Sequence, residues 1–353
     1  MALKITDIQS KMDRAIANGH DAPKEREYVL LDFENFLKAV EPPQFIVEGL
    51  FEEHSVVGVV GPPESGKSLL LQEMALCVAL GVPFHGRRTK RGLVVYLVGE
   101  GQHGLRRRFQ ALETRYKDQL DGEIVPFRTA EVATSLIDPL EVARVQMAIA
   151  KHEASLEMQL TLLIVDTLAR FISPGDESKA MDMGSYLAAI DTLRGGAAAV
   201  SLHHPGHGES VRARGSSSFK AGLDTEFSVA CENQIVTVTC QKMKDGAKPE
   251  PFSFKIEPAT TRMATEDGAP VMSVLLTPTD PQVAKPPLRG KNQRLLLTKL
   301  ENEPKEPGVW TEGELRELAK STGMDRFRAR EAVFGLRQLG YLVQTIGGSR
   351  LAY

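Results

Sequence analysis

Residues 56–75 read VVGVVGPPESGKSLLLQEMA: an apolar strand-like run, a glycine loop and a helix-like segment. Gly61 to Ser68 fit the pattern G-x-x-x-x-G-K-[ST], and the flanks supply the strand and the helix that this pattern requires. The backbone N–H groups of such a loop and the start of the following helix attract phosphate, while Lys67 neutralises β- and γ-phosphate charge and the Ser68 hydroxyl binds Mg²⁺. The alternative is a purely structural glycine turn between a strand and a helix. The predicted cofactors are ATP and Mg²⁺, and the predicted nucleotide-binding residues are Gly61, Pro62, Pro63, Glu64, Ser65, Gly66, Lys67, Ser68 and Leu69.

Two carboxylates follow apolar strand-like segments. LTLLIVD ends at Asp166, where a P-loop ATPase places the acid that holds Mg²⁺, although an aspartate can also simply close a buried strand. LVVYLV leads to Glu100, which we expect at the same edge of the sheet as the loop, where it can accept the proton of an attacking water. Glu64 is a weaker candidate for this base, because side chains of such loops usually point away from the phosphates.

The segment AAAVSLHH ends in His203 and His204, and a polar residue there can sense the γ-phosphate and signal to the loop behind it. Adjacent residues of a strand point to opposite faces, so at most one of the two histidines faces the nucleotide. Metal binding by His203, His204 and His207 is a weaker alternative, because no Cys or carboxylate completes a tetrahedral set. The Arg/Gly/Ser-rich run around Arg212 and Arg214 suits a loop that grips a single strand, or an ordinary solvated loop.

QKMKDG places Lys242 and Lys244 two residues apart, on one face of a strand end. In a ring of subunits they could reach the ATP of a neighbour and stabilise charge in the transition state. The alternative is a solvated hairpin turn.

The bulk composition is that of a soluble globular protein. The chain has 353 residues, 42% of them hydrophobic and 25% charged, with no run of 18 apolar residues and no signal-peptide pattern at the N-terminus. Three scattered cysteines are too few for a disulfide framework or a zinc site, so we expect a cytoplasmic protein with no membrane partner. Residues 285–353 carry 13 Lys and Arg against 8 Asp and Glu, which leaves 30 against 38 for the remainder. A basic tail on an acidic body favours nucleic-acid binding by the tail.

The chain alternates strand-like Val/Ile/Leu runs with helix-length segments from residue 45 onward, which predicts an α/β fold with a mostly parallel sheet. TEFSVACEN and QIVTVTCQKM predict a hairpin turning near Asn233, and FSFKIEP a further strand. The expected organisation is a helical arm (1–40), an ATPase domain (41–277), a proline-rich linker (278–288) and a small C-terminal domain (289–353).

The C-terminal segment has three helical patterns followed by two short strands, the order of a winged helix-turn-helix. Its third helix would contact nucleic acid, and the residues predicted to do so are Arg326, Arg328, Arg330 and Arg337. Such domains also dock proteins, so both interpretations stay open.

Residues 45–257 resemble the RecA-like core of hexameric replicative helicases, and most closely the plasmid-type RepA helicase ATPases and related phage proteins. The resemblance rests on GPPESGKS, on YLVGE with its terminal Glu100, on LLIVDT with Asp166, and on the SLHH, RGSSSF and QKMKDG segments. The glutamate after the second strand and the histidine-ended strand are the more specific of these motifs.

The resemblance implies a ring, hexameric in this family, that uses Mg-ATP at subunit interfaces and holds single-stranded DNA in its channel. It implies catalytic or sensing roles for Lys67, Glu100, Asp166, His203 or His204, Lys242 and Lys244, although the commonest pattern has an arginine as one of the last two. The C-terminal domain departs from the plain plasmid helicases and suggests duplex or origin binding, or docking to a replication partner. A recombinase and an ATP-switched initiator or helicase loader are the alternatives to a helicase.

Overall fold

The computed structural model describes residues 30–38, 42–122, 124–130, 132–204, 214–280, 290–303, 308–338, 341–345 and 348–351. Contacts divide the chain into two units, Met1–Pro43 and Gln44–Tyr353. The described part of the first unit holds the short helix α2 (Phe33–Lys38), whose start is capped by the Asp32 carboxylate, which accepts the Asn35 N–H at 2.8 Å. Apolar side chains such as those of Leu30 and Phe36 are exposed in this unit.

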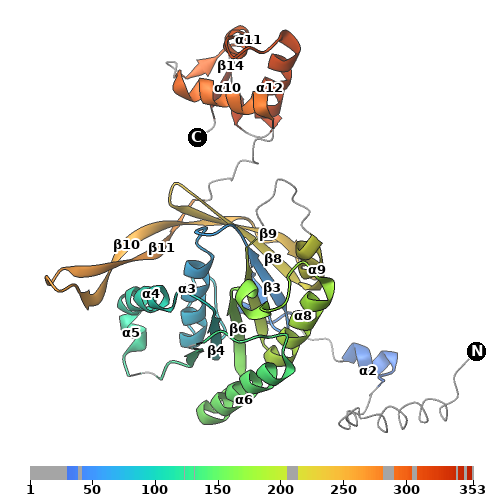
Figure 1. Ribbon diagram of the computed structural model, residues 1–353, viewed down its shortest axis with the longest axis vertical. Helices are drawn as coiled ribbons and strands as arrows, with labels where there is room; N and C mark the ends of the chain where they lie inside the picture. Colours follow the sequence, from blue (N-terminus) through green and yellow to red (C-terminus); the bar gives the residue numbers. More distant parts are fainter. Residues whose placement is uncertain are drawn as a thin grey trace, which may run out of the picture. The chain divides into compact units, whose positions relative to one another are not determined.

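The second unit is built on a nine-stranded sheet in the order β11-β10-β9-β8-β3-β7-β6-β4-β5 (Figure 1). Its parallel part consists of β8 (Thr225–Glu232), β3 (Val56–Val60), β7 (Ala198–His203), β6 (Leu160–Asp166), β4 (Leu93–Val98) and β5 (Phe127–Thr129). Its antiparallel extension consists of β9 (Ile235–Met243), β10 (Phe252–Ala264) and β11 (Pro270–Thr279). The expected α/β fold with a mostly parallel sheet is therefore confirmed.

Helices cover both faces of the sheet, which explains why every residue of β4, β6 and β7 is buried. One core cluster packs under α3 (Lys67–Leu80) and α4 (Gln102–Arg115). The other packs under α6 (Pro139–Leu156), α7 (Leu168–Ile172), α8 (Ala180–Arg194) and α9 (Arg214–Gly222). Smaller elements are α5 (Lys117–Leu120) and the two-stranded sheet of β1 (Phe45–Val47) and β2 (Phe51–Glu52).

The predicted β8–β9 hairpin is present and turns at Asn233 and Gln234, whose φ angles are 49° and 63°. Two predictions need correction. The segment expected to be a flexible loop forms α9 from Arg214 onward, while Arg212 lies outside the described residues. The proposed linker begins later than residue 278, because β11 continues to Thr279; residues 281–289 are not described.

The C-terminal residues form α10 (Lys291–Asn302), β12 (Val309–Trp310), α11 (Glu312–Ser321), α12 (Arg326–Gln338), β13 (Leu342–Thr345) and β14 (Gly348–Leu351). Three helices and a sheet in the order β12-β14-β13 enclose a separate apolar core. Thr311 caps the start of α11 in a capping box with Glu314. The winged-helix assignment of this part stays a prediction. Within the described residues, every helix is too short or too polar to cross a bilayer.

Candidate nucleotide-binding site

The loop between β3 and α3 requires glycine at both of its ends. A Cβ on Gly61 would lie 2.2 Å from the Val229 carbonyl oxygen, and Gly66 has a φ of 87° and would place a Cβ 2.6 Å from Val236. Glu64 is exposed, as expected for a side chain on the outer side of the loop. Both ends of the loop therefore pack closely against β8 and β9, where a larger side chain would not fit.

Lys67 is buried at the first position of α3, with 3% of its surface exposed. Its ammonium donates to the carbonyl oxygens of Gly61 at 2.9 Å and Pro62 at 2.7 Å, and to the Ser65 hydroxyl at 3.3 Å. Burial lowers the pKa of Lys67 to about 8, against the opposing field of Asp166. Phosphate oxygens would offer this ammonium stronger, charged acceptors in place of the loop's own oxygens.

Asp166 ends β6 as a buried carboxylate, and Tyr96 on β4 donates its hydroxyl to it at 2.7 Å. Tyr96 is fully buried, so it holds Asp166 in one orientation. The Ser68 hydroxyl and the Asp166 carboxylate are hard oxygen donors, which suit Mg²⁺ bound partly through substrate phosphates. No group of three or more His, Cys, Asp or Glu side chains in the described residues could hold a metal by itself. The residues present thus fit an ion that arrives with its nucleotide.

Glu100 follows β4 and forms an ion pair with Arg170 at the start of α7. The guanidinium donates to Glu100 Oε2 from Nε at 2.9 Å and from Nη2 at 2.7 Å. Gly99 makes this approach possible, because a Cβ there would lie 2.5 Å from the Arg170 Cβ. The proposed base therefore carries a cationic partner that the sequence did not reveal.

The two histidines at the end of β7 face different surroundings. His204 lies beside the loop, with Nδ1 at 3.3 Å from the Gly61 carbonyl oxygen. Burial lowers the pKa of His204, as does Lys67, while the fields of Asp166 and Glu100 oppose this. His203 is buried and packs edge-on against Phe219 of α9. Of the two, His204 is the better placed to sense a γ-phosphate, and His207 lies outside the described residues.

Parallel strands end at one edge of a sheet, and this edge brings the predicted residues together. The loop follows β3, Glu100 follows β4, Asp166 ends β6 and His204 follows β7. The Gly61 carbonyl oxygen lies 2.9 Å from Lys67 Nζ and 3.3 Å from His204 Nδ1, so the loop and the end of β7 meet at this edge.

Lys242 and Lys244 have partners within the chain. Lys242 Nζ donates to carbonyl oxygens at the end of α9, including that of Lys220 at 3.0 Å. Lys244 forms an ion pair with Asp224 at 3.5 Å. A role toward a neighbouring subunit stays a prediction, and it requires the Lys242 ammonium to leave these carbonyls.

The arginines of α12 also differ from one another. Arg337 donates to the Ser349 hydroxyl at 3.1 and 2.7 Å and pairs with Glu312, so it joins α12 to its own domain. The other three are exposed: Arg326, Arg328 and Arg330. These three remain the candidates for a phosphate backbone.

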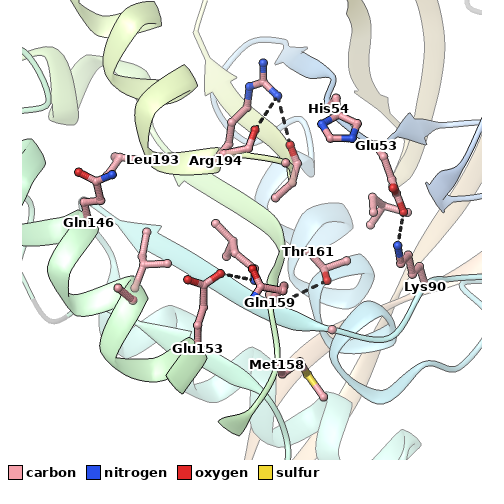
Figure 2. Close-up of a pocket in the computed structure, with 18 of the residues that line it drawn as sticks. Glu53, His54, Lys90, Gln146, Glu153, Met158, Gln159, Thr161, Leu193 and Arg194 are labelled. Carbon is pink, nitrogen blue, oxygen red and sulfur yellow. Dashed lines mark hydrogen bonds and ion pairs between the residues drawn. The ribbon is translucent and has the colours of Figure 1, made fainter. Parts of the chain in front are cut away.

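A cavity of about 660 Å³ opens at the opposite edge of the sheet, where β4, β6 and β7 begin (Figure 2). Its charged groups already have partners: Lys90 pairs with Glu53, and Glu153 accepts the Leu160 N–H at 2.7 Å. None of the predicted site residues lines it. The candidate site is therefore the loop edge.

The parallel sheet and the glycine loop at this edge define a P-loop nucleotide-binding domain. Residues 22–210 match the AAA_25 family, described as an AAA domain. This match spans more than half of the chain, so the chain belongs to that family. The solved structure of the RadB recombinase is similar over 59% of this chain and 89% of that chain, with 14% sequence identity and a TM-score of 0.40. The comparison with curated proteins gave no match.

Proposed function

We propose that the chain is an ATP-dependent DNA helicase or translocase of replication, which hydrolyses Mg-ATP in a ring of subunits and moves on single-stranded DNA. One observation carries the hydrolytic part: Glu100 stands at the same sheet edge as Lys67, Asp166 and His204. The motifs that resemble RepA-type helicases support the motor, the ring and the strand as ligand.

Each residue has a physical task in this proposal. Lys67 and the loop amides hold the β- and γ-phosphates, and Ser68 and Asp166 hold Mg²⁺, which neutralises phosphate charge when bound. Glu100, once released from Arg170, accepts the proton of the attacking water. His204 Nδ1 lies 3.3 Å from the Gly61 carbonyl oxygen of the loop, so this side chain can report the nucleotide state.

The ion pair between Glu100 and Arg170 also favours a second candidate, an ATP-switched initiator or loader. A base held by a cation suits slow turnover, in which nucleotide binding rather than repeated hydrolysis changes the assembly. A recombinase is the third candidate and would form an open filament on DNA rather than a closed ring.

Steady-state ATP hydrolysis with and without single-stranded DNA separates these candidates, with Lys67→Ala as the blank. A motor is expected to hydrolyse ATP at least about tenfold faster with the strand, since turnover is tied to movement. Slow hydrolysis that ignores DNA would reject the motor in favour of the switch, and images of DNA-bound particles would distinguish rings from filaments.

Replacing Arg326, Arg328 and Arg330 together by alanine is expected to weaken duplex binding. The negative slope of log K against log salt should become less steep by roughly 2 to 3. The measurement is the affinity for a DNA duplex at salt concentrations from about 50 to 200 mM, the range over which phosphate contacts change affinity strongly. Arg316→Ala is the matched control, because Arg316 is an exposed arginine of the neighbouring helix α11. Unchanged affinity in the triple variant would make this domain a protein-docking module.

A further inference from the structure

A second pair of ionisable side chains lies behind the nucleotide site. Glu177, in the turn between α7 and α8, directs Oε2 toward His203 Nδ1, at 3.7 Å. Both atoms are buried, and neither has a hydrogen-bond partner among the described residues. A buried polar atom without a partner is costly, and here two of them face each other just beyond hydrogen-bonding distance.

The pair is connected to the phosphate-binding loop through the backbone. The His203 carbonyl oxygen accepts the N–H of Gly61, the first residue of the loop, at 3.2 Å. On the other side, the turn that carries Glu177 is internally fixed, since the Asp176 carboxylate accepts both the N–H of Ser178 at 2.8 Å and its hydroxyl at 2.6 Å. If Glu177 Oε2 moved into hydrogen-bonding distance of His203 Nδ1, this turn would move toward β7, the strand that supports the loop.

Burial and nearby charges disfavour the ionised forms of both His203 and Glu177. Burial lowers the pKa of His203 to about 4, and the positive fields of His204 and Lys67 act in the same direction. Burial also raises the pKa of the Glu177 carboxyl, with a contribution from Asp176. The apolar ring of Phe219 also packs edge-on against the His203 imidazole. Burial is the larger cause of the lowered His203 pKa, and nucleotide phosphates beside Lys67 would oppose the positive field that adds to it.

We propose that Glu177 is a positioning residue, which closes onto His203 as an imidazolium when nucleotide phosphates occupy the loop, so that nucleotide binding takes up a proton at this pair. The step adds one solvent proton to Nδ1 of neutral His203, while Glu177 stays a carboxylate and becomes its ion-pair partner. The resulting charge-assisted hydrogen bond satisfies both buried atoms. The proposal rests on the proposed function only in taking ATP as the ligand of the loop.

Calorimetry on the full chain tests this, using Mg²⁺ with a non-hydrolysable ATP analogue at pH near 6.5, in buffers of different ionisation enthalpy. Binding is expected to take up about half a proton if the pKa of His203 rises to its ordinary value of about 6.5. Because proton binding and analogue binding are reciprocally coupled, the affinity for the analogue should rise about fourfold between pH 7.5 and 6.0, measured relative to the His203→Gln variant.

Glu177→Gln keeps the shape of the side chain but not its charge, and it is expected to bind the analogue with most of the uptake lost. Asp191→Asn removes an exposed carboxylate of α8 that pairs with Arg194, away from His203, and should retain the uptake. Binding by the wild-type chain without uptake, or equal uptake in His203→Gln, would overturn the proposal. Absence of analogue binding by the wild-type chain would instead refute the nucleotide site itself. The His203 Cε1–H resonance, followed with pH with and without the analogue, gives the same decision in the unaltered chain.

Discussion

Lys67→Ala is expected to lose ATP hydrolysis by roughly a hundredfold or more, together with most of its affinity for Mg-ATP. The ammonium is the cation that the loop presents to phosphate, and it is held within the loop by three donor contacts. Alanine keeps the helical backbone of α3 and leaves the anionic ligand facing amide N–H groups alone. The measurements are the hydrolysis rate and the equilibrium binding of a labelled nucleotide.

The fold should survive this change, because the apolar cores on both faces of the sheet do not involve Lys67. A melting curve compared with that of Lys90→Ala, which removes a lysine at the opposite edge of the sheet, controls for stability. Hydrolysis retained in Lys67→Ala, with the melting curve unchanged, would remove the loop from the mechanism.

The central strands β3, β4, β6 and β7 were predictable from the sequence because each lies within a largely apolar run. LTLLIVD and AAVSLH are mostly apolar on both faces, which is the pattern of strands covered on both sides, and the structure buries all their residues. The edge that collects the site follows from the same pattern, since parallel strands end together. The predictable part of the site therefore consists of the residues that immediately follow strands.

The partners of those residues were not predictable. Tyr96 and Arg170 are each 70 residues away in sequence from the carboxylates that they contact, Asp166 and Glu100. These residues come together because β4 and β6 are neighbouring strands of the sheet. The spacing of residues along the sequence does not reveal the order of strands in a sheet. A tyrosine inside an apolar strand also looks like any other core residue.

FSFKIEP was predicted as a strand and begins β10, but its partner β11 was missed for a related reason. β11 contains Pro270 and Pro278, which argue against a strand when the sequence is considered alone. β11 is an edge strand, paired on one side only, so proline is tolerated there. The hydrogen bonds of Lys242 to α9 were equally hidden, because α9 itself looked like a loop.

Glu100→Gln is expected to lower ATP hydrolysis by about a hundredfold or more while Mg-ATP binding remains close to that of the wild-type chain. Glutamine is isosteric and still accepts from Arg170, but it cannot take a proton from water at neutral pH. The loss therefore belongs to the chemical step, and single-turnover hydrolysis of bound ATP measures it directly.

Glu64→Gln is the matched control, since Glu64 is the exposed glutamate of the loop and should leave the rate unchanged. Arg170→Ala tests the partner: an exposed ion pair contributes no more than about 1 kcal/mol, so freeing Glu100 should raise DNA-independent hydrolysis by severalfold at most. A large loss in Arg170→Ala would mean that the guanidinium orients Glu100 for reaction instead of restraining it. If Glu64→Gln were the inactive variant and Glu100→Gln active, the base would be assigned to the loop, and the ion pair between β4 and α7 would have only a structural role.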